Sequence, residues 1–259
     1  MNKVIILSVQ PQWLHKILTG KKTIEIRKSM PKCDYPIDVY LYCTKSDENL
    51  YKVFREVYMY FDMGVAEPFE YFKYYKLDGY DYSGKGKARF EIENGFYDEL
   101  YHKLNGKIVA KFTLNKPKKF QIFDSYSSYG NWLTEDGFIN SNKQIEEFLS
   151  KSCMSDIQLQ DYAGFPDFEI YQYGGETKEG IFYAWHIDNL EIFKKPMELS
   201  EFYRNNYQVI QDYESCNNYD CIYAVDNSIL GDDGYCPVDE CPRLRVSRPP
   251  QSWGYAYKE

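Results

Sequence analysis

The chain lacks any run of about 18 consecutive apolar residues, the length that a membrane-spanning helix needs. Its first three residues lead directly into the short apolar stretch Val4 to Leu7, without the longer apolar region and cleavage site of a secretory signal peptide. We therefore expect a soluble, cytoplasmic protein with no membrane partner. Its seven cysteines are an odd number, which argues against a complete disulfide framework and favours thiols or metal ligands in a reducing compartment.

Positive charge is also scarce. The 259 residues include 31 Lys and Arg against 39 Asp and Glu, a net charge of −8. Sequence-independent binding of long nucleic acid depends on neutralising phosphates with cations, so this balance argues against a protein that coats RNA or DNA. The basic residues that are present gather at 16–32, 116–119 and 243–248. A small anionic or nucleobase ligand therefore remains compatible with the charge.

Several standard catalytic patterns are missing. The sequence has no P-loop, no dinucleotide-binding G-x-G-x-x-G and no H-E-x-x-H zinc motif. One of its three histidines, His186, follows Trp185 in a predicted strand, where a lone histidine is more often a structural hydrogen-bonding group than a catalytic one. Aromatic residues, in contrast, are abundant, with 27 Tyr and 16 Phe. We expect most of them to fill cores and interfaces, and a minority to be available for stacking on bases.

Short strands dominate the predicted organisation. A short helix is predicted to begin at Pro11 and to end at Gly20. The pattern indicates an α+β fold, a mixed β-barrel with helices around it, in one domain over residues 1–259. The predicted strands are Val4 to Val9, Thr23 to Arg27, Ile37 to Cys43, Lys107 to Leu114, Ile181 to Ile187, Leu190 to Phe193 and a closing strand at Trp253.

Two insertions interrupt these strands, at about 50–104 and 120–180. The first begins with apolar residues at helical spacing, from Val53 to Phe61, and predicts a helix in a lid or an interface. The second contains Ser141, a candidate N-cap, followed by a helical face that includes Phe148. Both insertions are therefore expected to be helical.

The segment Ile17 to Lys28, ILTGKKTIEIRK, concentrates charge beside a glycine. A strand that begins at Lys21 would place the charged side chains on one face and the two isoleucines on the other. We then expect the charged groups to serve a site and the isoleucines to carry the packing, with Lys22 on the opposite face unless the turn at Gly20 redirects it. The alternative is a solvated strand whose surface ion pairs contribute about 0 to 1 kcal/mol each. The charged face comprises Lys21, Thr23, Glu25 and Arg27.

Four of these residues also carry a family resemblance. Gly20, Lys22, Glu25 and Arg27 match the G-x-K-x-x-E-x-R motif of the ASCH domain. Five segments in order along the chain resemble ASCH proteins that are common in bacteriophages of Gram-positive hosts: 7–32, 39–45, 105–116, 184–203 and 247–257. The resemblance implies a PUA-like mixed β-barrel, encoded by a phage or prophage.

The resemblance further implies recognition of a nucleotide, a modified nucleobase or a short RNA in a cleft at the motif. Arg27 offers a planar fork for a phosphate or a carbonyl edge, and Glu25 accepts hydrogen bonds from an exocyclic amine. A second reading is a protein that binds a host protein through its acidic, tyrosine-rich surface. The residues expected to bind the ligand are Gly20, Lys21, Lys22, Thr23, Glu25 and Arg27.

An enzyme is a further alternative, because amidohydrolase and ribonuclease activities are associated with members of the family. Some small ASCH proteins are amidohydrolases that act on acetylated cytidine, and their proposed mechanism uses the motif lysine, which Lys22 matches here, with a threonine two residues before the arginine. Glu25 occupies that position, and Thr23 lies a full strand repeat away, about 6 to 7 Å. Hydrolysis by that route is therefore not expected.

A cysteine-bearing segment near the C-terminus, at about 214–242, contains two C-x4-C pairs separated by fourteen residues. Two such pairs are compatible with a tetrahedral four-thiolate site for structural zinc, the alternative being four unligated thiols. The segment has few aliphatic residues, so a metal would supply order that a core cannot. The candidate zinc ligands are Cys216, Cys221, Cys236 and Cys241, and the remaining cysteines, Cys33, Cys43 and Cys153, are expected to be packed thiols.

Overall fold

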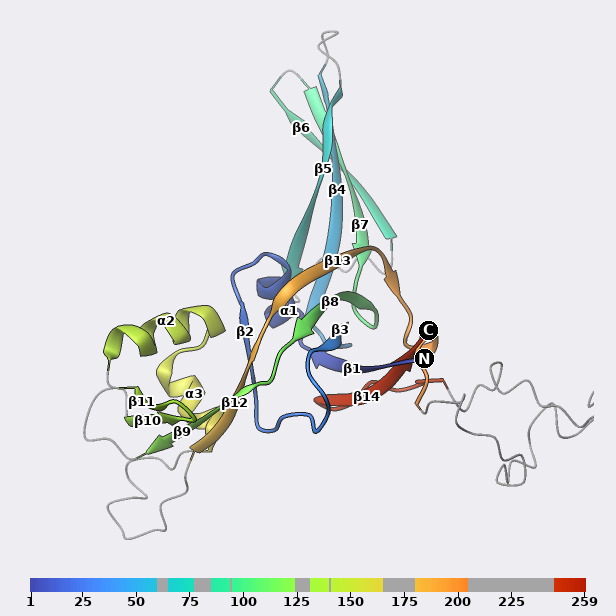
Figure 1. Cartoon of the computed structure of the whole chain (residues 1–259). Coiled ribbons are helices and arrows are strands. Elements are labelled where there is room, and N and C mark those ends of the chain that lie inside the picture. Colours follow the sequence, from blue (N-terminus) through green and yellow to red (C-terminus); the bar gives the residue numbers. More distant parts are fainter. Residues whose placement is uncertain are drawn as a thin grey trace, which may run out of the picture.

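The computed structural model describes residues 1–59, 65–76, 85–93, 95–123, 131–139, 141–164, 180–204 and 245–259. In these residues three β-sheets combine with three α-helices, which confirms the α+β class (Figure 1). A short 3-10 helix, η1 (Leu199–Glu201), follows the strand that ends at Met197. Among the described residues, no helix has the length and apolar character needed to cross a membrane.

The first sheet has the strand order β13-β8-β3-β1-β14. β1 and β3 are parallel, and the other neighbours are antiparallel. The inner strand β1 is buried on both faces from Val4 onward, which explains the apolar run Val4 to Leu7. Because β14 pairs with β1, the two ends of the chain lie side by side (Figure 1). The bounds are β1 (Asn2–Val9), β3 (Ile37–Cys43), β8 (Ile108–Leu114), β13 (Asp188–Met197) and β14 (Trp253–Lys258).

Helix α1 (Pro11–Leu18) packs on this sheet as predicted. Proline occupies its first position, and Leu14 and Ile17 join the same core cluster as Ile5 and Leu7. Gly20 follows with a φ of +72°, a left-handed conformation in which glycine avoids the Cβ clash. This turn sets the direction in which the motif leaves the helix.

The second sheet, β11-β10-β9-β12-β2, is covered by α2 and α3 (Figure 1). Ser141 precedes α2 as predicted, and the apolar face of α2 packs with Phe120, Trp132 and Phe182 in one aromatic cluster. Ile24 and Ile26 of β2 belong to the same cluster. The bounds are β2 (Ile24–Arg27), β9 (Lys118–Phe123), β10 (Asn131–Thr134), β11 (Gly137–Ile139), α2 (Asn142–Ser152), α3 (Asp156–Ala163) and β12 (Gly180–His186).

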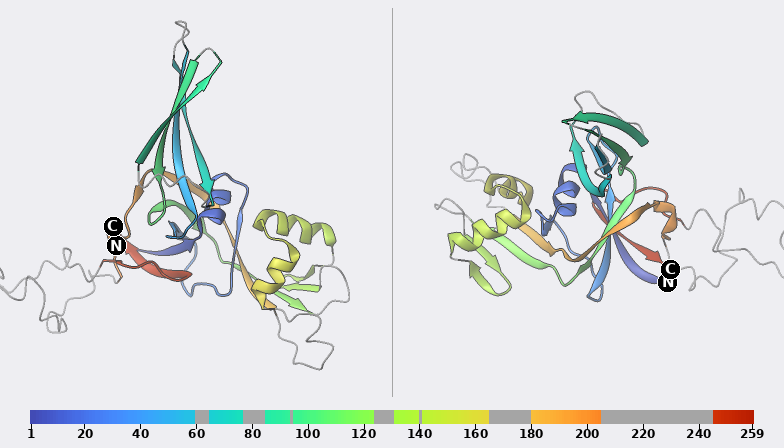
Figure 2. Two further views of the ribbon diagram at one scale, coloured as in Figure 1. Left: turned by 180° about the vertical axis from the view of Figure 1, so that it is seen from behind. Right: turned by 90° about the horizontal axis from the view of Figure 1, so that it is seen from above.

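The third sheet, β5-β4-β7-β6, is antiparallel and projects away from the rest of the molecule (Figures 1 and 2). It replaces the helix predicted from Val53, so that prediction is wrong. The helical spacing misled because Val53 lies in a small core on one face while Phe54 packs near His102 on the other, which removes the alternation of a one-sided strand. β-branched and aromatic residues also favour strands. The bounds are β4 (Asn49–Met59), β5 (Val65–Tyr75), β6 (Lys85–Ile92) and β7 (Gly95–Lys103).

The described strands therefore form three separate sheets, and the expected closed barrel is not shown among them. The second insertion, at about 120–180, contains α2 and α3 as expected, together with short strands. The first, at about 50–104, is helix-free in its described part. The first and second sheets matter most for function, because the motif strand β2 lies at the edge of the second sheet and faces the end of β1 in the first.

Candidate functional site

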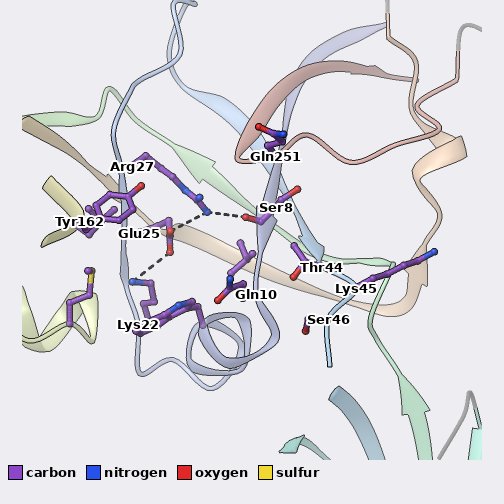
Figure 3. A pocket seen from close by; sticks show the side chains of 14 residues that line it. Ser8, Gln10, Lys22, Glu25, Arg27, Thr44, Lys45, Ser46, Tyr162 and Gln251 are labelled. Carbon is purple, nitrogen blue, oxygen red and sulfur yellow. Dashed lines mark hydrogen bonds and ion pairs between the residues drawn. The ribbon is translucent and has the colours of Figure 1, made fainter. Parts of the chain in front are cut away.

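A cavity of about 480 Å³ lies between β2, the end of β1 and the start of α1 (Figure 3). Segments that are far apart in the sequence meet there, including the loop after β3, the link between α2 and α3, the end of α3, and the turn before β14. The lining residues are Ser8, Val9, Gln10, Trp13, Lys22, Glu25, Ile26, Arg27, Thr44, Lys45, Ser46, Met154, Tyr162 and Gln251.

Three charged side chains of the motif form a continuous chain of ion pairs on the wall of this cavity. Glu25 Oε2 lies 3.5 Å from Lys22 Nζ, and Glu25 Oε1 lies 3.1 Å from Arg27 Nη2 (Figure 3). Lys22 is only 3% exposed and Glu25 only 7%. Glu25 therefore lies between two cations, Lys22 and Arg27, and the interpretation as a solvated surface strand is wrong.

Lys22 joins the site although simple alternation placed it on the opposite face. The strand begins only at Ile24, so Lys22 lies before it, where strand alternation does not decide which side chain enters the site. The turn at Gly20 directs the Lys22 side chain inward, while Lys21 and Thr23 are exposed. The prediction of one charged face from Lys21 to Arg27 is therefore wrong in its first half.

Arg27 links the second sheet to the first across the cavity. Its Nη2 donates to the carbonyl oxygen of Ser8, at 3.0 Å, and its Nη1 donates to Ser252 Oγ, at 3.2 Å. Ser8 lies in β1 and Ser252 lies just before β14. The guanidinium is thus held in one orientation by a carboxylate, a carbonyl and a hydroxyl, as its planar fork allows.

Lys22 is tied to the end of α2. Its Nζ donates to the carbonyl oxygen of Ser152, the last residue of that helix, at 2.5 Å. The backbone N–H of Thr23 donates to the carbonyl of Lys151, at 2.9 Å. Burial lowers the pKa of the Lys22 ammonium, while the neighbouring Glu25 carboxylate opposes this shift.

Three polar atoms of the lining residues have no hydrogen-bond partner among the described residues. They are Glu25 Oε2, Arg27 Nε and Thr44 Oγ1, all buried. Buried polar atoms are nearly always paired with protein or with ordered water. Glu25 Oε2 is held by its ion pair with Lys22, so Arg27 Nε and Thr44 Oγ1 are the two of these atoms that have neither a hydrogen-bond nor an ion-pair partner among the described residues.

Two aromatic rings, from Trp13 and Tyr162, also line the cavity. Tyr162 lies beside Glu25 and Arg27 (Figure 3), with Lys28 Nζ 5.5 Å from its ring centroid. Burial is the main cause that raises the pKa of the Tyr162 hydroxyl, so this group stays protonated at neutral pH. The cavity thus combines a charged wall with aromatic surfaces.

Of the six residues predicted to bind a ligand, Lys22, Glu25 and Arg27 line the cavity, and Gly20, Lys21 and Thr23 do not. Sequence reasoning did not single out Tyr162 or Gln251, which lie more than a hundred residues from the motif. Thr44 directly follows a predicted strand. This position at the end of a strand is the one signal in the sequence that Thr44 could belong to a site, and it is not sufficient to assign Thr44 to this cavity.

The other candidate residues lie elsewhere. Trp185 is fully buried in the first core, and His186 is half-buried with its pKa lowered mainly by that burial. The candidate zinc ligands, Cys216, Cys221, Cys236 and Cys241, fall outside the described residues. Within the described residues, no three His, Cys, Asp or Glu side chains are grouped as metal ligands.

Comparisons with known proteins complete the description. A solved structure titled crystal structure of ASCH from Zymomonas mobilis is similar to this chain with 11% sequence identity and a TM-score of 0.35. The match covers 75% of this chain and 73% of that one. No curated protein matches the sequence. Residues 7–116, which include the whole motif, match the family model of the ASCH domain.

Proposed function

We propose that the cavity beside β2 binds a nucleotide, a modified nucleobase or the end of a short RNA. ASCH domains are generally associated with binding of RNA and other nucleic acids, and we propose the PUA-like arrangement of the family for this segment. The observation that carries the proposal is the Lys22–Glu25–Arg27 chain of ion pairs on the wall of a cavity.

The size of the cavity supports a ligand of one nucleoside or nucleotide. Pockets for small molecules span about 300 to 1,000 Å³, and this one measures about 480 Å³. A longer RNA would place one base in the cavity, while the acidic remainder of the protein offers little to its other phosphates.

The chemistry of the wall supports the same class of ligand. The Glu25 carboxylate can accept from an amino or imino group, and the Arg27 guanidinium can donate to a carbonyl or phosphate oxygen. The three charged residues carry a net formal charge of +1, and Lys45 adds a further cation to the lining. A planar, polar ring with an attached anionic group therefore meets a hydrogen-bond acceptor, a hydrogen-bond donor and positive charge in this cavity.

Isothermal titration calorimetry with the four nucleosides and their 5′-monophosphates tests this proposal. We expect at least one of them to bind, and Glu25→Gln and Arg27→Lys to weaken that binding at least tenfold. Lys21→Ala is the matched control, since Lys21 belongs to the same motif but is exposed and outside the cavity lining. The proposal fails if none of the eight compounds binds, or if all three variants bind like the parent.

A second candidate is binding of a host protein, which the projecting sheet favours. Phe69 and Leu100 of that sheet are 46% and 39% exposed, and exposed aromatic and aliphatic side chains are common at protein interfaces. This function would survive Arg27→Lys and be weakened by Phe69→Glu in pull-down from host lysate, which separates it from ligand binding. Phage or prophage origin and cytoplasmic location are part of the same proposal, and the genes that flank the coding sequence would test the origin.

A further inference from the structure

The helix pair α2–α3 lies outside the segment that matches the ASCH domain, yet it supplies one wall of the cavity. Met154, between the helices, and Tyr162, in α3, both line it (Figure 3). The position of this wall relative to the motif strand therefore depends on contacts that the family segment does not contain by itself.

Lys22 makes the closest of these contacts. Its Nζ donates to the Ser152 carbonyl at 2.5 Å and lies 3.5 Å from Glu25 and 5.2 Å from the centroid of the Trp13 ring. The last carbonyls of a helix have no partner within the helix and form the negative end of its dipole, so a cation there is stabilising. An ammonium has three donors, and these contacts occupy the directions available to a group that is 3% exposed.

The end of α2 is rigidly connected to Tyr162. Residues 153–155 join the two helices, and Ser155 begins α3 with a capping box in which it exchanges hydrogen bonds with Gln158. Leu159 anchors α3 in the second core. A displacement of the last turn of α2 would therefore also displace the ring of Tyr162.

We propose that Lys22 is a positioning residue that clamps the α2–α3 pair against the motif strand, so that Tyr162 presents its ring for stacking on the ligand. The inference rests on the proposed function and narrows it to ligands with a planar aromatic ring. Lys22 then acts through the helix pair, while Glu25 and Arg27 contact the ligand directly.

Two measurements test the proposal. The first is hydrogen exchange of residues 141–164 in the free protein, compared between the parent, Lys22→Met and Lys22→Arg. We expect faster exchange in Lys22→Met, which loses the donor to Ser152, and partial rescue in Lys22→Arg, which keeps a cationic donor. Unchanged exchange in Lys22→Met would overturn the clamp.

The second measurement is affinity for the four 5′-monophosphates, which stays informative if Lys22→Met does not fold. Stacking on an aromatic side chain contributes about 1 to 3 kcal/mol per base, so we expect Tyr162→Ala to lose about 5- to 150-fold in affinity and Tyr162→Phe, which keeps the ring, to lose much less. Ile157→Ala is the control, because Ile157 lies on the same helix and is exposed. Should a nucleotide bind Tyr162→Ala as tightly as the parent, the proposed function would stand and this inference would fail. If no nucleotide binds the parent, the proposed function fails and the stacking role of Tyr162 fails with it.

Discussion

Removing the Glu25 carboxylate should destabilise the fold as well as the site. The sequence suggested that Ile24 and Ile26 alone carry the packing of this strand, but Glu25 is 7% exposed and holds two cations within 3.5 Å. Glu25→Ala would leave the buried Lys22 ammonium and the partly buried Arg27 guanidinium without a counter-charge. Breaking a buried ion pair from one side costs about 3 to 5 kcal/mol, because the remaining charge loses its compensation.

This cost is large enough to measure by thermal unfolding. For a protein of this size, each kcal/mol of destabilisation lowers Tm by about 2 to 4 °C, so Glu25→Ala should lower Tm by about 6 to 20 °C. Thr23→Ala, two residues earlier and exposed, should lower it by less than about 2 °C, as surface substitutions do. Differential scanning calorimetry gives both values.

A double variant separates loss of the ion pair from loss of volume. Lys22→Met together with Glu25→Ala removes one of the two stranded cations, so it should be less destabilised than the sum of the single variants. Interacting neighbours differ from additivity by about 0.5 to 3 kcal/mol. Strict additivity, or a Tm for Glu25→Ala within 2 °C of the parent, would refute the reasoning.

Three further predictions concern other parts of the chain. Acetylated cytidine should not release acetate efficiently, because Glu25 stands where a hydroxyl is expected; turnover that disappears in Lys22→Ala, measured by chromatography, would contradict this. Elemental analysis should find about one zinc per chain, lost in Cys236→Ser, because four thiolates close a structural site. If protein prepared without chelator contains no metal, the four cysteines are ordinary thiols and the prediction is wrong. Burial alone would raise the pKa of Glu99, but hydrogen bonds from Tyr101, Tyr71 and Arg55 outweigh it and hold that pKa low. The ionised Glu99 carboxylate therefore contributes to stability above the ordinary carboxyl pKa, and this contribution is lost as the pH falls through the lower pKa of the folded state. Proteolysis of the projecting sheet should therefore increase in acid, and Glu99→Gln should reduce that pH dependence.

The fold of residues 1–43 could be predicted from the sequence because its signals are local. The apolar run of β1, the proline that opens α1 and the glycine that ends it each act within a few residues. The charged strand was found for the same reason. Gly20 also shows the limit of such reasoning. Alternation along the strand could not predict that the turn at Gly20 brings Lys22 into the site.

The rest of the site depends on contacts between distant segments. Tyr162 reaches the cavity only because α3 packs on the second sheet, and no spacing in the sequence connects it to Arg27. The projecting sheet was mistaken for a helix because both faces of β4 carry apolar side chains. In each case tertiary packing decides what local periodicity leaves open.

The projecting sheet leaves the first sheet and returns to it at almost the same point. β3 and β8, which flank it in the sequence, are hydrogen-bonded neighbours, and the Gly106 N–H donates to the carbonyl of Cys43 at 2.8 Å. Residues 49–103 thus form a module whose ends already meet, the geometry at which insertions and deletions are tolerated. Joining β3 to β8 by a short turn would shorten the loop that must close before these strands pair, and so lower its entropic cost. The cavity-bearing part of the molecule could then be studied without most of the projecting sheet, whose base, with Leu50 buried, packs in the core of the first sheet.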